Sequence, residues 1–129
     1  MFEVSVETTF AAAHALLIAG RREPLHGHNW HTTVTLAGPA LDRDGLLIDF
    51  HAVERLLKDI TAPFHNGNLN DTPPFTNLNP SAENVALHIA RALAAGLEAA
   101  GITRGGARIR AVHITEAPGC AATDFPPSP

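Results

Sequence analysis

The sequence predicts an α+β fold built on an antiparallel sheet, and three observations support this. Apolar and polar residues alternate over residues 2–10 and again over residues 29–37, which is the period of a half-buried strand. Two helical patterns follow, and another strand pattern comes only after both of them. Because the strands come in neighbouring pairs and do not alternate with helices, the order favours α+β over a doubly wound parallel sheet.

The two predicted helices have signals at their ends as well as along their lengths. Over residues 51–62 the apolar positions follow the i, i+3, i+4, i+7 rule, and Asp49 is placed to cap that helix. Ser81 begins a second, alanine-rich helix that reaches residue 100 and ends at Gly101. Its predicted buried stripe consists of Ala86, Ile89, Leu93 and Leu97.

The remaining segments complete the predicted topology. Residues 63–80 form a loop rich in Asn, Pro and Gly, and its length makes it a candidate wall of a functional site. Residues 107–116 form the next strand, and a short segment through Phe125 is expected to pair with it. We expect one domain over residues 1–125 and a disordered tail over residues 126–129.

The composition argues against several classes of function. Nine Lys and Arg against thirteen Asp and Glu give a net charge of −4, which argues against nucleic-acid binding and leaves no basic patch for a membrane. The expected partner is therefore a small molecule. The single Cys120 excludes an intramolecular disulfide, so a metal would be held by His or carboxylate ligands. The acidic N-terminus does not fit a signal peptide and no transmembrane span is apparent, which predicts a cytoplasmic location.

Two histidines spaced two residues apart, His26 and His28, are the first indication of a metal site. On an extended strand both side chains point to the same side, here the side that carries the apolar residues. His14, after the first strand pattern, is the candidate third ligand. Three imidazoles with no fourth protein ligand leave one coordination position open, as in catalytic zinc sites.

Six phrases, in the same order and with similar spacing, resemble the 6-pyruvoyl-tetrahydropterin synthase family, which includes the bacterial 6-carboxy-tetrahydropterin synthases of queuosine biosynthesis. They are Phe-Ala-Ala-Ala-His at 10–14, Leu-His-Gly-His-Asn at 25–29, Gly-Leu-Leu-Ile-Asp-Phe at 45–50, Leu-Asn-Asp at 69–71, Asn-Pro-Ser-Ala-Glu-Asn at 79–84, and Glu116. The resemblance implies a tunnelling fold, with a four-stranded antiparallel sheet and two helices on one face. It also implies a homo-oligomer, in which the sheets of three copies form a barrel that is usually doubled into a hexamer.

The resemblance also implies a substrate and a set of roles. The three histidines would bind Zn²⁺, and Glu116 would anchor a pterin ring through hydrogen bonds. Ser81 and Glu83 lie where the family has further pterin contacts at the start of the second helix. The implied reaction is a carbon–oxygen lyase step, the elimination of triphosphate from dihydroneopterin triphosphate. Zinc acts there as a Lewis acid while a base removes a neighbouring proton.

Two departures from the family pattern leave the catalytic residues open. The family's cysteine position holds Arg22, but the next residue, Glu23, gives Glu-x-x-His-Gly-His, which resembles a subgroup whose product is the folate precursor 6-hydroxymethyl-dihydropterin. In the long loop the family's Asp-His pair aligns with His65 and Asn66, and a one-residue slip would put His65 in the catalytic position. Glu23 and His65 are therefore the candidate catalytic residues.

Two alternatives remain at this stage. The chain could be a zinc- and pterin-binding homologue whose activity is altered or lost. It could also be an unrelated zinc hydrolase in which the loop over residues 63–80 supplies the base.

Overall fold

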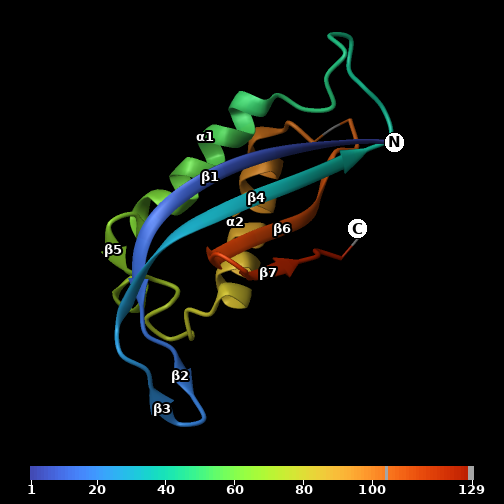
Figure 1. Cartoon of the computed structure of the whole chain (residues 1–129). Helices are drawn as coiled ribbons and strands as arrows, with labels where there is room; N and C mark the ends of the chain where they lie inside the picture. Colours follow the sequence, from blue (N-terminus) through green and yellow to red (C-terminus); the bar gives the residue numbers. More distant parts are fainter. Residues whose placement is uncertain (104, 128–129) are drawn as a thin grey trace.

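Two long antiparallel strands, β1 (Phe2–His14) and β4 (His26–Gly38), dominate the computed structural model, which describes residues 1–103 and 105–127. β6 (Arg108–Ala117) pairs with β4, and β7 (Cys120–Asp124) pairs with β6, both antiparallel. Figure 1 shows the four strands as one curved and twisted layer. The α+β class, the four antiparallel strands and the pairing of the last short segment are confirmed.

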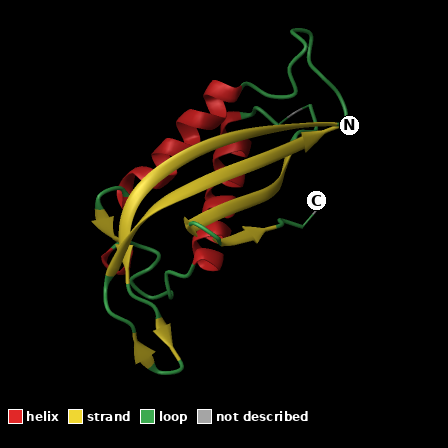
Figure 2. Cartoon of the chain, viewed as in Figure 1, coloured by secondary structure: helices red, strands yellow, loops and turns green. Residues whose placement is uncertain are grey.

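Helices α1 (Phe50–Thr61) and α2 (Ala82–Ala100) both lie on one face of this sheet (Figure 2). The predicted caps are confirmed, because the Asp49 side chain accepts a hydrogen bond from the His51 N–H and Ser81 does the same for Asn84. Gly101 ends α2 with a left-handed φ of 69°. The predicted stripe of α2, consisting of Ala86, Ile89, Leu93 and Leu97, is buried.

The core lies between the helices and the even-numbered residues of β1 and β4. Phe10 and Trp30 face each other across the two strands and stack with ring centroids 5.8 Å apart. The odd-numbered residues of β1, such as Glu3 and Glu7, are exposed on the opposite face. Even-numbered residues near the strand ends are therefore directed towards the buried side of the sheet.

The structure corrects the predicted strand ends and the predicted loop. β1 continues to His14 and β4 begins at His26, because the two backbones pair along their whole length, although the alanine run at 11–13 breaks the sequence alternation. The segment predicted as a plain loop contains two short 3-10 helices, η1 (Ala62–Phe64) and η2 (Leu69–Asp71). Between them, the two-residue strand β5 (Gly67–Asn68) pairs parallel to β1 and gives the sheet a fifth strand.

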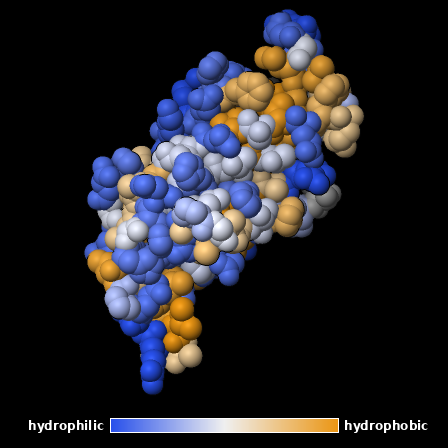
Figure 3. Space-filling model, viewed as in Figure 1, coloured by the Kyte–Doolittle hydropathy of each residue, from blue (hydrophilic) through white to orange (hydrophobic). Residues whose placement is uncertain are grey.

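A small hairpin, unpredicted because two-residue strands have no measurable period, connects β1 to β4. It consists of β2 (Leu17–Ile18) and β3 (Arg21–Arg22) and projects from one end of the molecule. Figure 3 shows polar residues at its tip and apolar residues along one side, where Leu17 and Ile18 are exposed.

Two sequence predictions concern the ends of the chain and its relation to membranes. Residues 128 and 129 of the predicted tail lie outside the described residues. Within the described part of the chain, no helix is long and apolar enough to cross a membrane. The cytoplasmic location stays a prediction.

Candidate metal centre and active site

The strand register brings the three predicted histidines together. His14, the last residue of β1, lies directly opposite His26, the first residue of β4, and His28 lies opposite Ala12. All three have even numbers and lie on the helix side of the sheet. The ring centroids of His26 lie 4.7 Å from those of both His14 and His28, and the His14 and His28 centroids are 5.2 Å apart.

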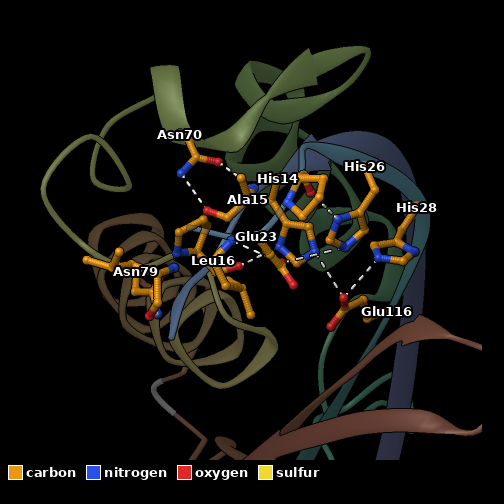
Figure 4. Close-up of polar contacts among 12 residues, drawn as sticks. His14, Ala15, Leu16, Glu23, His26, His28, Asn70, Asn79 and Glu116 are labelled. Carbon is orange, nitrogen blue, oxygen red and sulfur yellow. Dashed lines mark hydrogen bonds and ion pairs between the residues drawn. The ribbon is translucent and has the colours of Figure 1, made fainter. Parts of the chain in front are cut away.

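Glu116, near the end of β6, completes this group. Its Oε1 atom lies 2.9 Å from the Nε2 atoms of both His14 and His28 (Figure 4). One potential ligand atom from each of the four residues lies within 4.8 Å of the others. We refer to these four residues, His14, His26, His28 and Glu116, as the histidine–glutamate cluster. The residue that the resemblance assigns to pterin binding thus lies against the candidate metal ligands.

Hydrogen bonds to backbone carbonyls orient two of the imidazoles. His14 Nδ1 lies 2.8 Å from the carbonyl oxygen of Pro80, and His26 Nδ1 lies 2.9 Å from that of Pro24. A carbonyl oxygen only accepts, so each Nδ1 carries the hydrogen, and a neutral ring then presents the lone pair of Nε2. Metal-binding histidines are commonly held in this way, with the second ring nitrogen donating to a carbonyl.

The cluster fits a zinc ion by its donor set and by its unsatisfied atoms. Among the described residues, the buried Nε2 of His28 has no well-aligned hydrogen-bond partner, although Glu116 Oε1 lies 2.9 Å away. Burial lowers the pKa of His28, and this effect outweighs the nearby charge of Glu116, which alone would raise that pKa. The lowered pKa favours the neutral form of the ring, which is the form that binds a metal. Three imidazole nitrogens are a ligand set of catalytic zinc sites, in which the fourth position takes a water or the substrate, so the cluster does not need Glu116 as a ligand.

Glu23, the candidate base, lies at the edge of the cluster. Its Oε1 accepts a hydrogen bond of 3.0 Å from the Leu16 N–H, and its own N–H donates to the Leu16 carbonyl at 2.9 Å. The same Oε1 lies 3.8 Å from His26 Nε2. The structure therefore brings a carboxylate next to the candidate metal ligands, from the residue that follows Arg22 in the phrase Glu-x-x-His-Gly-His.

His65 and Asn66, which align with the family's Asp-His pair, have different surroundings. His65 is exposed, and its Nδ1 accepts a hydrogen bond of 3.2 Å from the Ala11 N–H. Asn66 has a φ of 60° and, with Gly27 and His28, lines an open hollow of about 370 Å³. Asn66 therefore shares the lining of this hollow with His28, whereas the His65 ring is hydrogen-bonded to the backbone of β1.

Ser81 and Glu83, the other candidate substrate contacts, lie at the beginning of α2. Ser81 forms the helix cap described above, and Glu83 is exposed in the first turn. The carbonyl that orients His14 belongs to Pro80, the residue before Ser81. The start of α2 is thus connected to the cluster through the backbone.

Sequence reasoning gave no individual role to two asparagines that hold the segment after His14. The amide of Asn70 bonds both the N–H and the carbonyl of Ala15, and the amide of Asn79 does the same for Leu17. The sequence signal that could have indicated a role was their position in the polar loop over residues 63–80, within the family phrases at 69–71 and 79–84.

The description "6-pyruvoyl tetrahydropterin synthase" belongs to a family model that matches residues 3–125. The chain belongs to this family. A relative from Archaeoglobus fulgidus, described as a putative 6-carboxy-5,6,7,8-tetrahydropterin synthase, is 29% identical over 91 residues, which cover 70% of this chain and 75% of the relative. Family membership supports a pterin synthase activity of the lyase type for this chain.

Solved structures of the 6-pyruvoyl tetrahydropterin synthase family share the fold. The Caenorhabditis elegans enzyme matches with a TM-score of 0.80 at 22% identity, covering 98% of each chain. A Plasmodium vivax enzyme matches with a TM-score of 0.78 at 19% identity, covering 95% of this chain and 96% of its own. That second structure is of a catalytic-residue mutant in which a glutamate is replaced by alanine. The predicted tunnelling fold is confirmed.

Proposed function

We propose that the chain is a zinc-dependent carbon–oxygen lyase that acts on dihydroneopterin triphosphate or a closely related pterin. The observation that carries the proposal is the position of the Glu23 carboxylate, 3.8 Å from His26 at the edge of the histidine–glutamate cluster. Support also comes from the Plasmodium vivax relative, in which a glutamate is described as a catalytic residue.

The chain's own residues divide the proposed work between them. His14, His26 and His28 would hold the zinc ion, which when bound supplies Lewis-acid polarisation of a substrate oxygen. Glu23 accepts the proton of the neighbouring carbon, since a carboxylate is an effective general base when it is held within reach. Glu116 accepts hydrogen bonds from the amino and ring N–H groups of the pterin, because an ionised carboxylate is an acceptor for such donors.

The proposed assembly is a ring of three copies, doubled into a hexamer. Among the described residues, β1 has a strand partner on its outer edge only at Ala12 and Ala13, and β7 is the outermost strand on the opposite side of the sheet. The two strands run in opposite directions, because each neighbouring pair from β1 through β4 and β6 to β7 is antiparallel. β7 of one copy would therefore extend the sheet antiparallel to β1 of the next, a head-to-tail contact that closes into a ring.

The proposal is tested by incubating zinc-loaded protein with dihydroneopterin triphosphate and identifying the products by mass spectrometry. We expect release of triphosphate and either 6-hydroxymethyl-dihydropterin or a tetrahydropterin as the second product. Glu23→Gln should lower kcat roughly 10²- to 10⁴-fold with unchanged zinc content, because it removes the proton acceptor. Glu54→Gln, at a partly exposed carboxylate on α1, is the matched control and should leave kcat unchanged. Absence of triphosphate release, or release that is unaffected by Glu23→Gln, would contradict the proposal.

A pterin-binding homologue with altered or lost activity is the second candidate. The surroundings of His65 favour it, because the ring nitrogen that bonds the Ala11 N–H is not free for a proton relay. Pterin binding that Glu116→Ala weakens, without turnover by the parent chain, would support this candidate. Failure to bind any pterin would exclude both candidates.

A further inference from the structure

Each of the three residues after His14 forms backbone hydrogen bonds with a residue further along the chain, and Figure 4 shows two of them, Ala15 and Leu16, beside Asn70 and Glu23. Asn70 Oδ1 accepts from the Ala15 N–H at 2.8 Å, and Asn70 Nδ2 donates to the Ala15 carbonyl at 2.9 Å. Asn79 makes the same pair of bonds with Leu17, at 2.9 and 3.0 Å. Leu16, between them, bonds Glu23 through both its N–H and its carbonyl.

The two asparagine amides take the place of neighbouring strands. Beyond His14 the ladder between β1 and β4 has ended, so the peptide groups of Ala15 and Leu16 need other partners, and Leu17, the first residue of β2, has a strand neighbour only on the β3 side. A carboxamide carries a donor and an acceptor side by side, as an adjacent peptide does, and can satisfy both groups of one residue. Asn70 lies in η2 and Asn79 lies shortly before α2, so the segment is fixed from both ends of the intervening loop.

This arrangement controls where the carboxylate of Glu23 lies. Glu23 is attached to Leu16 by its N–H and by its side chain, so the position of Leu16 sets the distance from Glu23 to His26. The position of Leu16 depends in turn on its neighbours Ala15 and Leu17, whose backbones are held by Asn70 and Asn79. The backbone next to Asn79 also reaches the cluster, because the adjacent Pro80 carbonyl accepts from His14.

We propose that Asn70 and Asn79 are positioning residues that hold the Glu23 carboxylate against the histidine–glutamate cluster by fixing the backbone of Ala15 and Leu17. This inference rests on the proposed function, in which Glu23 accepts the substrate proton. Neither amide needs to touch the substrate for this role.

The kinetic test compares Asn70→Ala and Asn79→Ala with Asn77→Ala, using zinc-loaded protein and dihydroneopterin triphosphate. Asn77 is an exposed residue of the same loop. We expect kcat to fall by a factor of about 10 to 100 in the first two variants, since small misplacements of a reacting group have effects of this size. KM should stay within about twofold of the parent value in all three variants, because none of the three side chains is proposed to contact the substrate. Loss that appears in KM alone would overturn the proposal.

A double variant separates positioning of Glu23 from a general structural role. If Asn79 acts through Glu23, then adding Asn79→Ala to Glu23→Gln should reduce kcat no further. A multiplicative loss in the double variant would overturn the proposal. Thermal unfolding of each single variant checks that the fold is retained.

Amide hydrogen exchange of the substrate-free protein gives a readout that does not depend on turnover. The Leu16 N–H bonds the Glu23 carboxylate directly, so its protection reports whether that carboxylate is in place. In Asn79→Ala we expect the Leu16 amide to exchange at least about tenfold faster while amides within α2 keep their rates. Unchanged Leu16 protection would overturn the proposed positioning. If the parent chain lacks turnover but Asn79→Ala still speeds exchange of the Leu16 amide, the proposed function is contradicted and the positioning role of Asn79 is supported.

Discussion

His88 shows at the scale of one residue how packing changes the acid–base behaviour of this chain away from the cluster. His88 belongs to α2, and its ring lies 5.7 Å from that of Phe64 and 5.6 Å from that of Phe75, in edge-on contacts. Burial lowers the pKa of His88 from its ordinary value of 6.5. The neutral ring is therefore the form that the folded protein favours.

This shift predicts a loss of stability in acid. Because the pKa of His88 is lower in the folded chain, the unfolded chain binds the proton more tightly, and the free energy of unfolding falls as the pH drops below 6.5. The loss stops once the pH is below the folded-state pKa. Urea unfolding measured from about pH 7.5 to about pH 5 should show a smaller loss for His88→Gln than for the parent chain.

His51→Gln is the control for this measurement, because the His51 side chain is 82% exposed. It should keep the pH dependence of the parent chain. Equal pH dependence in His88→Gln and the parent would contradict the assignment to His88.

Residue types and spacing predicted the three histidines but could not predict where Glu116 lies. Alternation along one strand tells which side His26 and His28 occupy, and this needs only local information. The contact between His14 and Glu116 joins residues 102 positions apart. It depends on the register of β4 with β6, which shifts between Thr35 and Leu36, and the sequence carries no visible signal for that shift.

At the scale of elements, the pairing of β1 with β4 is what builds the candidate metal centre. The ladder runs without a shift from Phe2 opposite Gly38 to His14 opposite His26. A slip of one residue would move the histidines of one strand to the exposed face and separate the cluster. The sequence predicted both strands except for the ends that meet at the cluster, because the alanine run at 11–13 breaks the apolar pattern of the first strand and Gly27 interrupts it at the start of the second.

Gly38, at the other end of this ladder, is predicted to be required for close packing. A Cβ atom there would lie 2.6 Å from Leu47 Cδ1 and 3.2 Å from the Ala107 Cα. Leu47 can rotate away but the backbone of Ala107 cannot, so Gly38→Ala should lower the free energy of unfolding by about 1 to 3 kcal/mol. Urea denaturation measures this change.

Gly27→Ala is the matched control, because a Cβ atom at that position meets nothing within 4 Å. Its free energy of unfolding should stay within about 0.5 kcal/mol of the parent value. A free energy of unfolding for Gly38→Ala that equals the parent value would contradict the packing argument.

For the whole molecule, the described residues leave the outer edge of β7, and that of β1 except at Ala12 and Ala13, without a neighbouring strand. An unpaired edge exposes backbone donors and acceptors that invite another strand. The resemblance predicted an oligomer, and the direction of β1 relative to β7 gives that prediction a geometric basis that local patterns could not supply.

The assembly prediction is checked by sedimentation equilibrium over a series of dilutions. The measured mass should be three or six times the 13.6 kDa of one chain, because the proposed ring has three copies and its doubled form has six. A stable monomer or dimer would contradict the proposed ring.

The long sequence separation within the histidine–glutamate cluster also bears on the order of folding. Three of its residues lie within one antiparallel pair, which forms by closing a short connection, whereas Glu116 arrives only when β6 docks on β4. Contacts between residues so far apart in sequence carry a larger entropic cost of loop closure and form late. The complete cluster is therefore assembled only after the sheet has formed, so an early folding intermediate would hold the histidines without their carboxylate.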